Sequence, residues 1–299
     1  MVSTDPSPAP PIVDFFIVGV QKGGTTALDA YLSLSPHVQM AKVKEVHFFD
    51  DETIDWSRPD YRLLIDQFCW TAGARLRRGE ATPVYSYWPN ALERLQRYNP
   101  KAKLIICLRH PAFRAYSHWR MEMRRGSESL SFEQAITELG RRRIQASEGA
   151  HRAFSYVERG FYGEQVSRMK RLFPPAQLLF LRTDELWSET TRVVSRVHAL
   201  LGVPPPEAVE RNYVTPADAF DPGDIPKEAL LMLNALYADD IARTSRLTGI
   251  DLSDWLSPDY RDIGDMASRR GVGGAKKPLP TRRRLTLDKD FVSHIWETS

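Results

Sequence analysis

The chain has 299 residues, of which 42% are hydrophobic and 26% charged, which is typical of a globular protein. This composition excludes a fully disordered chain and a collagen-like fibre, and two cysteines are too few for a disulfide scaffold. No apolar run approaches the roughly 20 residues that span a bilayer, so we expect no transmembrane segment and a cytoplasmic location. The net charge of +3 is too small to indicate a nucleic-acid partner.

The N-terminal elements begin after a proline-rich leader, residues 1–11, which is predicted to be disordered. Residues 12–18 form a nearly continuous apolar run, typical of a strand that is buried on both faces. A glycine-rich turn follows, and then Leu28 and Leu32 recur at helical spacing until Pro36 ends the segment. The order is therefore strand, turn and helix.

Two later segments repeat this order. Residues 103–108 predict a buried strand, and Pro111 occupies a favourable first position for a helix. Residues 177–182 predict a further strand, followed by apolar residues at helical spacing up to Leu201. Three such units predict an α/β fold with a central parallel sheet flanked by helices.

The C-terminal part divides into a helix and a basic tail. A helix is predicted over residues 228–247, and we place the end of the compact domain at residue 256, so that the domain covers residues 12–256. Residues 257–299 form a basic extension whose cations include seven arginines and lysines between residues 266 and 287.

A candidate phosphate-binding loop lies between the first predicted strand and helix. Glycines allow close approach of an anion to the backbone, a lysine supplies charge, and hydroxyls can donate to the same group. The candidate ligands are Lys22, Gly23, Gly24, Thr25 and Thr26. The alternative is a tight strand-to-helix turn capped by threonine.

This loop differs from that of nucleotide triphosphatases, in which the lysine follows the glycines. Here Lys22 precedes them. The later strand ends at Arg109, where a phosphate-hydrolysing enzyme would have an acid to hold magnesium. Both differences disfavour a kinase, and the cysteines show no metal-binding pattern, so we expect no metal site.

A second candidate anion site consists of Arg109 and Ser117. Arg109 ends a strand at the edge of the sheet where open α/β folds bind ligands, and Ser117 lies in the following helix. The pair can hold a phosphate separate from the one at Lys22. The alternative is a surface ion-pair residue and an ordinary helix position.

At this point the sequence resembles the sulfotransferases that use 3′-phosphoadenosine 5′-phosphosulfate (PAPS), in particular the heparan sulfate N- and 3-O-sulfotransferase branch. Residues 22–26 are similar to the loop around the 5′-phosphosulfate, and Arg109 with Ser117 to the 3′-phosphate pair. Residues 44–50 resemble the acceptor-side motif, and residues 160–162 the segment whose tyrosine, here Tyr162, contacts adenine. The resemblance implies a three-layer P-loop-like fold, PAPS as co-substrate and adenosine 3′,5′-bisphosphate (PAP) as product.

The resemblance also implies catalytic roles. Glu45 is expected to act as general base toward an acceptor hydroxyl, and Lys22 to neutralise charge on the leaving bridging oxygen. His47 is the alternative base, because side chains two residues apart point the same way if the stretch is extended. The expected acceptor is a carbohydrate, a glycolipid or a small natural product, and its identity and the oligomeric state remain open.

The chain departs from the heparan-type pattern at one motif, and a later segment resembles another branch of the family. The heparan-type motif Glu-Lys-Thr-Pro has Ala81 in place of its lysine. Residues 269–277 are similar to the cofactor loop of aryl sulfotransferases, so Arg270 and Gly271 are predicted to fold back as a lid over the cofactor. Alternatively, the tail is solvated or makes weak contact with an acidic acceptor or a membrane surface.

Two other functions stay open on the sequence. One is a nucleotide kinase with an atypical phosphate loop. The other is a nucleotide-binding or polyanion-binding module without catalysis, which the absent lysine at Ala81 and the basic tail favour.

Overall fold

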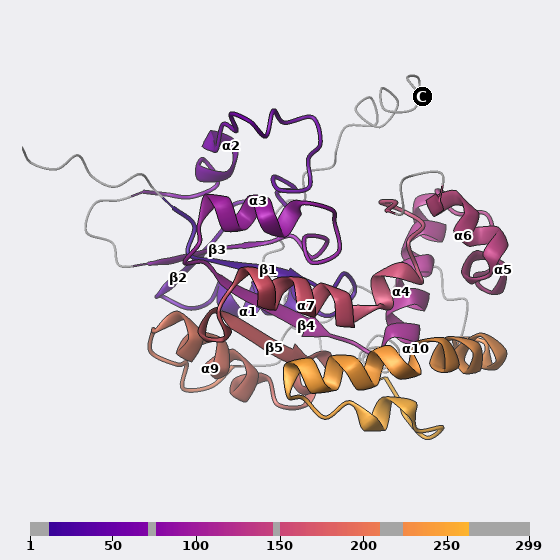
Figure 1. Cartoon of the computed structure of the whole chain (residues 1–299). Coiled ribbons are helices and arrows are strands. Elements are labelled where there is room, and N and C mark those ends of the chain that lie inside the picture. The colour runs from indigo at the N-terminus through magenta and orange to yellow at the C-terminus, as the bar shows by residue number, and fades with distance from the viewer. Residues whose placement is uncertain (1–11, 71–75, 146–149, 210–223, 263–299) are drawn as a thin grey trace, which may run out of the picture.

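The computed structural model describes residues 12–70, 76–145, 150–209 and 224–262 (Figure 1). At its centre lies a five-stranded sheet in the order β2-β3-β1-β4-β5, and every neighbouring pair is parallel. The strands are β1 (Phe15–Gly19), β2 (Val38–Met40), β3 (Arg77–Ala81), β4 (Lys103–Leu108) and β5 (Leu178–Arg182).

Successive side chains of β1 and β4 point to opposite sides of the sheet, so the sheet has two apolar faces. Helices cover both of these faces. Phe16 and Ile106 face one core, whereas Phe15 and Ile105 face the other. The first core is covered by α3 (Ala91–Tyr98), α4 (Pro111–Arg125), α7 (Tyr162–Leu172) and α10 (Lys227–Thr248). The second is covered by α1 (Thr25–Leu32), α8 (Thr183–Ser188) and α9 (Thr190–Leu201).

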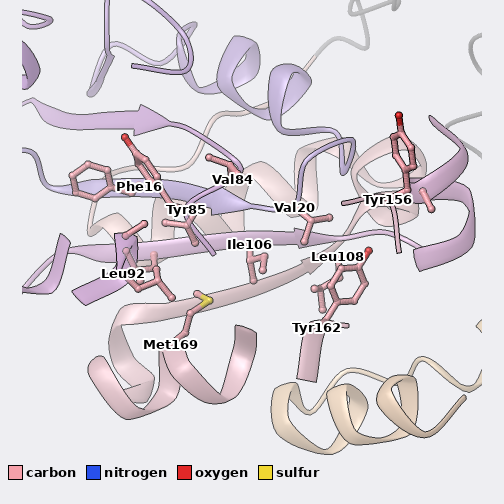
Figure 2. Close-up of a cluster of buried hydrophobic side chains, with 14 of the residues drawn as sticks. Phe16, Val20, Val84, Tyr85, Leu92, Ile106, Leu108, Tyr156, Tyr162 and Met169 are labelled. Atoms are coloured by element: carbon pink, nitrogen blue, oxygen red, sulfur yellow. The ribbon is translucent and has the colours of Figure 1, made fainter. Parts of the chain in front are cut away.

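The remaining helices are short. They are α2 (Arg62–Ile65), α5 (Phe132–Ile136), α6 (Glu138–Gln145) and the 3-10 turns η1 (Glu158–Gly160), η2 (Pro175–Gln177) and η3 (Ser253–Leu256). Figure 2 shows part of the first core, where Ile106 and Leu108 of β4 lie beside Met169 and Tyr162 of α7. None of the described helices is long and apolar enough to cross a bilayer.

The predicted α/β fold with three layers is confirmed. The strand expected over residues 103–108 is β4, the strand expected over 177–182 begins one residue later as β5, and the helix expected over 228–247 is α10. The first strand starts at Phe15, three residues after the expected position.

The apolar pattern did not reveal β2 or β3. β3 reads Arg-Arg-Gly-Glu-Ala, and its burial comes from neighbours far along the chain. A methyl group added to Gly79 would lie 2.0 Å from the Phe15 ring, so the ring packs directly on the β3 backbone. Only glycine permits this close approach.

The parallel strands place three loops at one edge of the sheet. β1 leads into the glycine-rich loop, β4 leads into Arg109, and β3 ends at Ala81. The loops are also linked directly, since the Ser86 amide after β3 donates to the Val18 carbonyl of β1 at 2.9 Å. Open parallel sheets bind ligands at this edge.

The two chain ends lie largely outside the described residues. The predicted leader, residues 1–11, and the predicted lid with Arg270 and Gly271 are not among them. Residues 257–262 are described, and they pack on the body at the start of α4, through contacts given below. The domain boundary at residue 256 stays a prediction.

Candidate active site

The glycine-rich loop is shaped by contacts that require glycine. Gly24, which immediately precedes α1, has a φ of 83°, in the left-handed region. A methyl group added to Gly23 would lie 2.5 Å from the carbonyl oxygen of Cys107 on β4, so the loop backbone packs against the neighbouring strand. The Gly23 amide donates to the Val20 carbonyl at 2.8 Å, which closes the turn.

This cradle fits a phosphate or phosphosulfate group. The first amides of α1 have no partner within the helix and point toward the loop, at the positive end of the helix dipole. Thr25 is buried and Thr26 half-buried at this end. Lys22 is half-buried and adds a positive charge beside them. The five predicted loop residues are therefore together at one helix N-terminus.

Arg109 joins the β4 edge to this loop. Arg109 is buried, and its Nη1 donates to the Lys22 carbonyl oxygen at 3.0 Å. Its Nε and Nη2 donate to the two carboxylate oxygens of Asp262 at 2.8 and 2.9 Å. Ser117 is half-buried in the second turn of α4. The structure brings Arg109 into contact with the backbone of Lys22 and with Asp262, neither of which the sequence indicated. The shared phosphate site of Arg109 and Ser117 stays a prediction.

Tyr162 has a structural position at the start of α7. Its side chain is buried, and its hydroxyl donates to the Arg109 carbonyl oxygen at 2.7 Å. Burial raises the pKa of this hydroxyl, which therefore stays protonated as a donor. Tyr162 holds the backbone of Arg109 in this arrangement, and its contact with adenine remains a prediction.

The acceptor-side motif adopts a compact turn. Glu45 and His47 have φ values of 62° and 57°, so the assumption of an extended stretch was wrong. The turn is fixed by β3, since Glu45 N donates to the Ala81 carbonyl at 3.1 Å. Buried Glu80 accepts from the Val46 amide at 3.2 Å, and burial raises the pKa of Glu80 to about 7.

The turn nevertheless brings the two candidate bases together. Lys44 Nζ lies 2.6 Å from Glu45 Oε1, and His47 Nε2 lies 3.7 Å from Glu45 Oε2. The other ring nitrogen of His47, Nδ1, lies 2.8 Å from Asp50 Oδ2. Glu45 is 19% and His47 30% exposed, whereas Lys44 and Asp50 are buried, so the first two are accessible to a ligand.

The charge state of His47 follows from these contacts. Burial alone would lower its pKa, but hydrogen bonds and charges from Asp50 and Glu45 outweigh burial and raise the pKa to about 9. Burial would raise the pKa of Asp50, but His47 and Arg152 together lower it. At neutral pH the ring is therefore a cation between two carboxylates, with both nitrogens as donors.

Two arginines that the sequence did not indicate connect this cluster to the phosphate loop. Arg152 donates to the carboxylate and the carbonyl of Asp50, and its guanidinium lies 4.3 Å from the centre of the Trp88 ring. Arg159 donates to Gln21 of the loop and, at 2.8 Å, to the Arg152 carbonyl. Burial lowers the pKa of Arg159 to about 10, which still leaves it charged at neutral pH. Arg159 directly precedes residues 160–162, which resemble the adenine-contacting segment of the family. This position was the local sequence feature that could have pointed to Arg159.

Two aromatic residues that follow β3 divide between the core and the site. Tyr85 is fully buried, and its hydroxyl accepts from the Phe48 amide at 3.0 Å. Trp88 is half-buried beneath Arg152, beside the acceptor-side motif. Within residues 12–70, 76–145, 150–209 and 224–262, no group of three or more histidine, cysteine or acidic residues is arranged to hold a metal ion.

Comparison with known proteins shows the family of the chain. Residues 13–216 match a family model described as sulfotransferase domain. Heparan sulfate glucosamine 3-O-sulfotransferase 6 of Mus musculus is 32% identical over 190 residues, 62% of this chain and 51% of that protein. The 3-O-sulfotransferase 3B1 of Homo sapiens is 31% identical over 195 residues, 62% of this chain and 45% of that protein. The chain thus spans about half the length of the curated relatives it matches.

A solved structure extends the likeness to the whole fold. The crystal structure of a sulfotransferase from Alicyclobacillus acidocaldarius aligns with a TM-score of 0.68 at 28% identity. The alignment covers 83% of this chain and all of that one.

Proposed function

Because the chain belongs to the sulfotransferase domain family, we propose that it transfers the sulfuryl group of PAPS to a hydroxyl of a carbohydrate-type acceptor, with Glu45 as general base. The observation that carries this proposal is the meeting of two sites at one sheet edge. The glycine loop of residues 19–26 packs closely on β4 and precedes the N-terminus of α1, and the neighbouring cluster presents an accessible carboxylate held by Lys44 and His47.

The chain offers separate groups for the two ends of PAPS, which supplies an activated sulfuryl group when bound. The 5′-phosphosulfate would be held by Lys22, Gly23, Gly24, Thr25 and Thr26. Arg109 and Ser117 would hold the 3′-phosphate, which distinguishes this co-substrate from ATP. Lys22 stands beside the cradle, where a cation stabilises negative charge on a departing phosphate oxygen.

Glu45 suits the role of base better than His47. A carboxylate accepts a proton without prior deprotonation, whereas His47, with a pKa of about 9, carries its proton at neutral pH. His47 instead acts as a cation that holds Glu45 through Nε2, and Asp50 fixes the ring through Nδ1. This arrangement orients the carboxylate toward an acceptor hydroxyl.

A sugar-type acceptor agrees with the surroundings of Glu45. The relatives at about 30% identity are named for sulfation of heparan sulfate glucosamine. Trp88 and the half-exposed Arg152 lie next to the cluster, and an aromatic ring with a charged neighbour suits a polar ring-shaped ligand. A glycolipid or a hydroxylated natural product would meet the same groups.

The test is sulfate transfer from PAPS to a panel of hydroxyl acceptors, followed by mass spectrometry of the products. We expect transfer by the parent protein and a loss of at least about 100-fold for Glu45→Gln, with PAP binding retained. Glu138→Gln, which changes an exposed carboxylate on α6, is the matched control and should transfer normally. Equal turnover by Glu45→Gln and the parent would overturn the assignment of the base.

A further inference from the structure

Arg109 already holds an anion that belongs to the chain itself. Asp262 accepts from Nε and Nη2 of Arg109 at 2.8 and 2.9 Å, and its side chain is buried. A guanidinium binds a carboxylate and a phosphate with the same two-pronged geometry. The carboxylate of Asp262 therefore occupies the edge of Arg109 that a phosphate ligand would use.

The segment that carries Asp262 is docked at the start of α4. Tyr260 stacks on the ring of His110, with centroids 4.9 Å apart and planes at 28°. His110 Nε2 lies 2.8 Å from the Trp255 carbonyl oxygen, and the Trp255 side chain is buried. These contacts hold residues 255–262 across the carboxyl end of β4.

With the segment docked, little room remains at Arg109. The pocket there is lined by Tyr260, Asp262 and Trp255 as well as by Arg109, and it has essentially no space that a water molecule could fill. Pockets that hold drug-sized ligands measure roughly 300–1,000 Å³. A nucleotide bisphosphate therefore needs the segment to move before its phosphate can reach Arg109.

We propose that Asp262 is an internal competitor for the 3′-phosphate site: its carboxylate occupies Arg109 until a ligand with a 3′-phosphate displaces it. This inference rests on the proposed function, since it takes Arg109 as the ligand of the 3′-phosphate. A phosphate carries more charge and more acceptor oxygens than a carboxylate, so it can replace Asp262 on the guanidinium. A nucleotide without this phosphate has no group that competes with Asp262 for the Arg109 guanidinium, so the segment stays docked.

The consequence for affinity follows from the competition. When the binding-competent state is only a fraction of the population, the apparent dissociation constant rises by the inverse of that fraction. Weakening the Asp262 contact raises the competent fraction, so it should tighten binding of PAP. Adenosine 5′-monophosphate (AMP), which lacks the 3′-phosphate, should gain much less.

The experiment measures dissociation constants of PAP and AMP by calorimetry for the parent and for Asp262→Asn. We expect PAP to bind about tenfold more tightly to Asp262→Asn, which corresponds to about 1.4 kcal/mol, with less than about a twofold change for AMP. Asp259→Asn removes an exposed carboxylate of the same segment and should change neither constant. An unchanged PAP affinity, or an equal gain for both ligands, would overturn the proposal.

Arg109→Met separates this proposal from the proposed function. If Arg109→Met leaves PAP affinity unaltered, the 3′-phosphate site itself is misplaced and the proposed function fails. If Arg109→Met weakens PAP binding but Asp262→Asn has no effect, only the role of Asp262 fails. In the double variant the gain from Asp262→Asn should disappear.

Hydrogen exchange tests the same displacement without any substitution, which matters if Asp262→Asn folds poorly. In the parent protein, PAP should increase amide exchange over residues 257–262, and AMP should not. Unchanged or slower exchange with PAP would contradict displacement of the segment.

Discussion

His47 provides a test of the acceptor-side cluster that depends only on pH. Its pKa is about 9 in the folded protein and 6.5 for an ordinary histidine. A pKa raised on folding stabilises the folded state fully below pH 6.5, and the contribution is lost as pH rises through 9. The two values correspond to roughly 3 kcal/mol of unfolding free energy.

Urea unfolding of the parent and of His47→Gln between pH 6 and 10 measures this contribution. The parent should lose roughly 3 kcal/mol relative to His47→Gln over that range, and the comparison cancels other groups that titrate there. Asp50→Asn, which removes the hydrogen-bond partner of Nδ1, should abolish much of the same dependence. Parallel pH profiles for the parent and His47→Gln would refute the charge assignment.

The pH profile of transfer separates the two candidate bases. If protonated His47 holds Glu45, kcat/KM should fall as pH rises through about 9. If His47 were the base, kcat/KM should instead rise through the same pH, because only the neutral ring accepts a proton.

Two glycines give further predictions. Gly23→Ala places a methyl group 2.5 Å from the Cys107 carbonyl oxygen, so the loop must shift and PAP should bind roughly tenfold more weakly in calorimetry. Gly79→Ala drives a methyl group into the Phe15 ring and should lower the unfolding free energy by about 1–3 kcal/mol in urea titrations, with the nucleotide site retained.

The helices and strands could be predicted where the local pattern of apolar residues indicates which side chains are buried. β4 and α10 lie within a residue of their predicted bounds, because one is a continuous apolar run and the other has helical spacing. β3 has no apolar pattern, and its burial depends on Phe15, more than sixty residues earlier in the chain. Local pattern cannot carry such information.

The site shows the same division. The glycine loop and residues 44–50 are contiguous motifs, so Lys22 and Glu45 could be proposed as site residues from the sequence. Arg152 and Asp262 reach the site through partners 102 and 153 residues away, and no spacing rule connects them. The Glu45 and His47 pair was predicted from an extended backbone that the structure replaces with a left-handed turn.

We propose that the glycine loop after β1 and Arg109 after β4 together recognise a nucleotide with a 3′-phosphate and a 5′-phosphosulfate. Thermal unfolding in the presence of PAP or of ATP with magnesium tests it most directly, because a ligand that binds only the folded state raises the melting temperature. We expect a clear increase in melting temperature with PAP and a smaller increase with ATP at equal concentration. An equal or larger increase with ATP would contradict it.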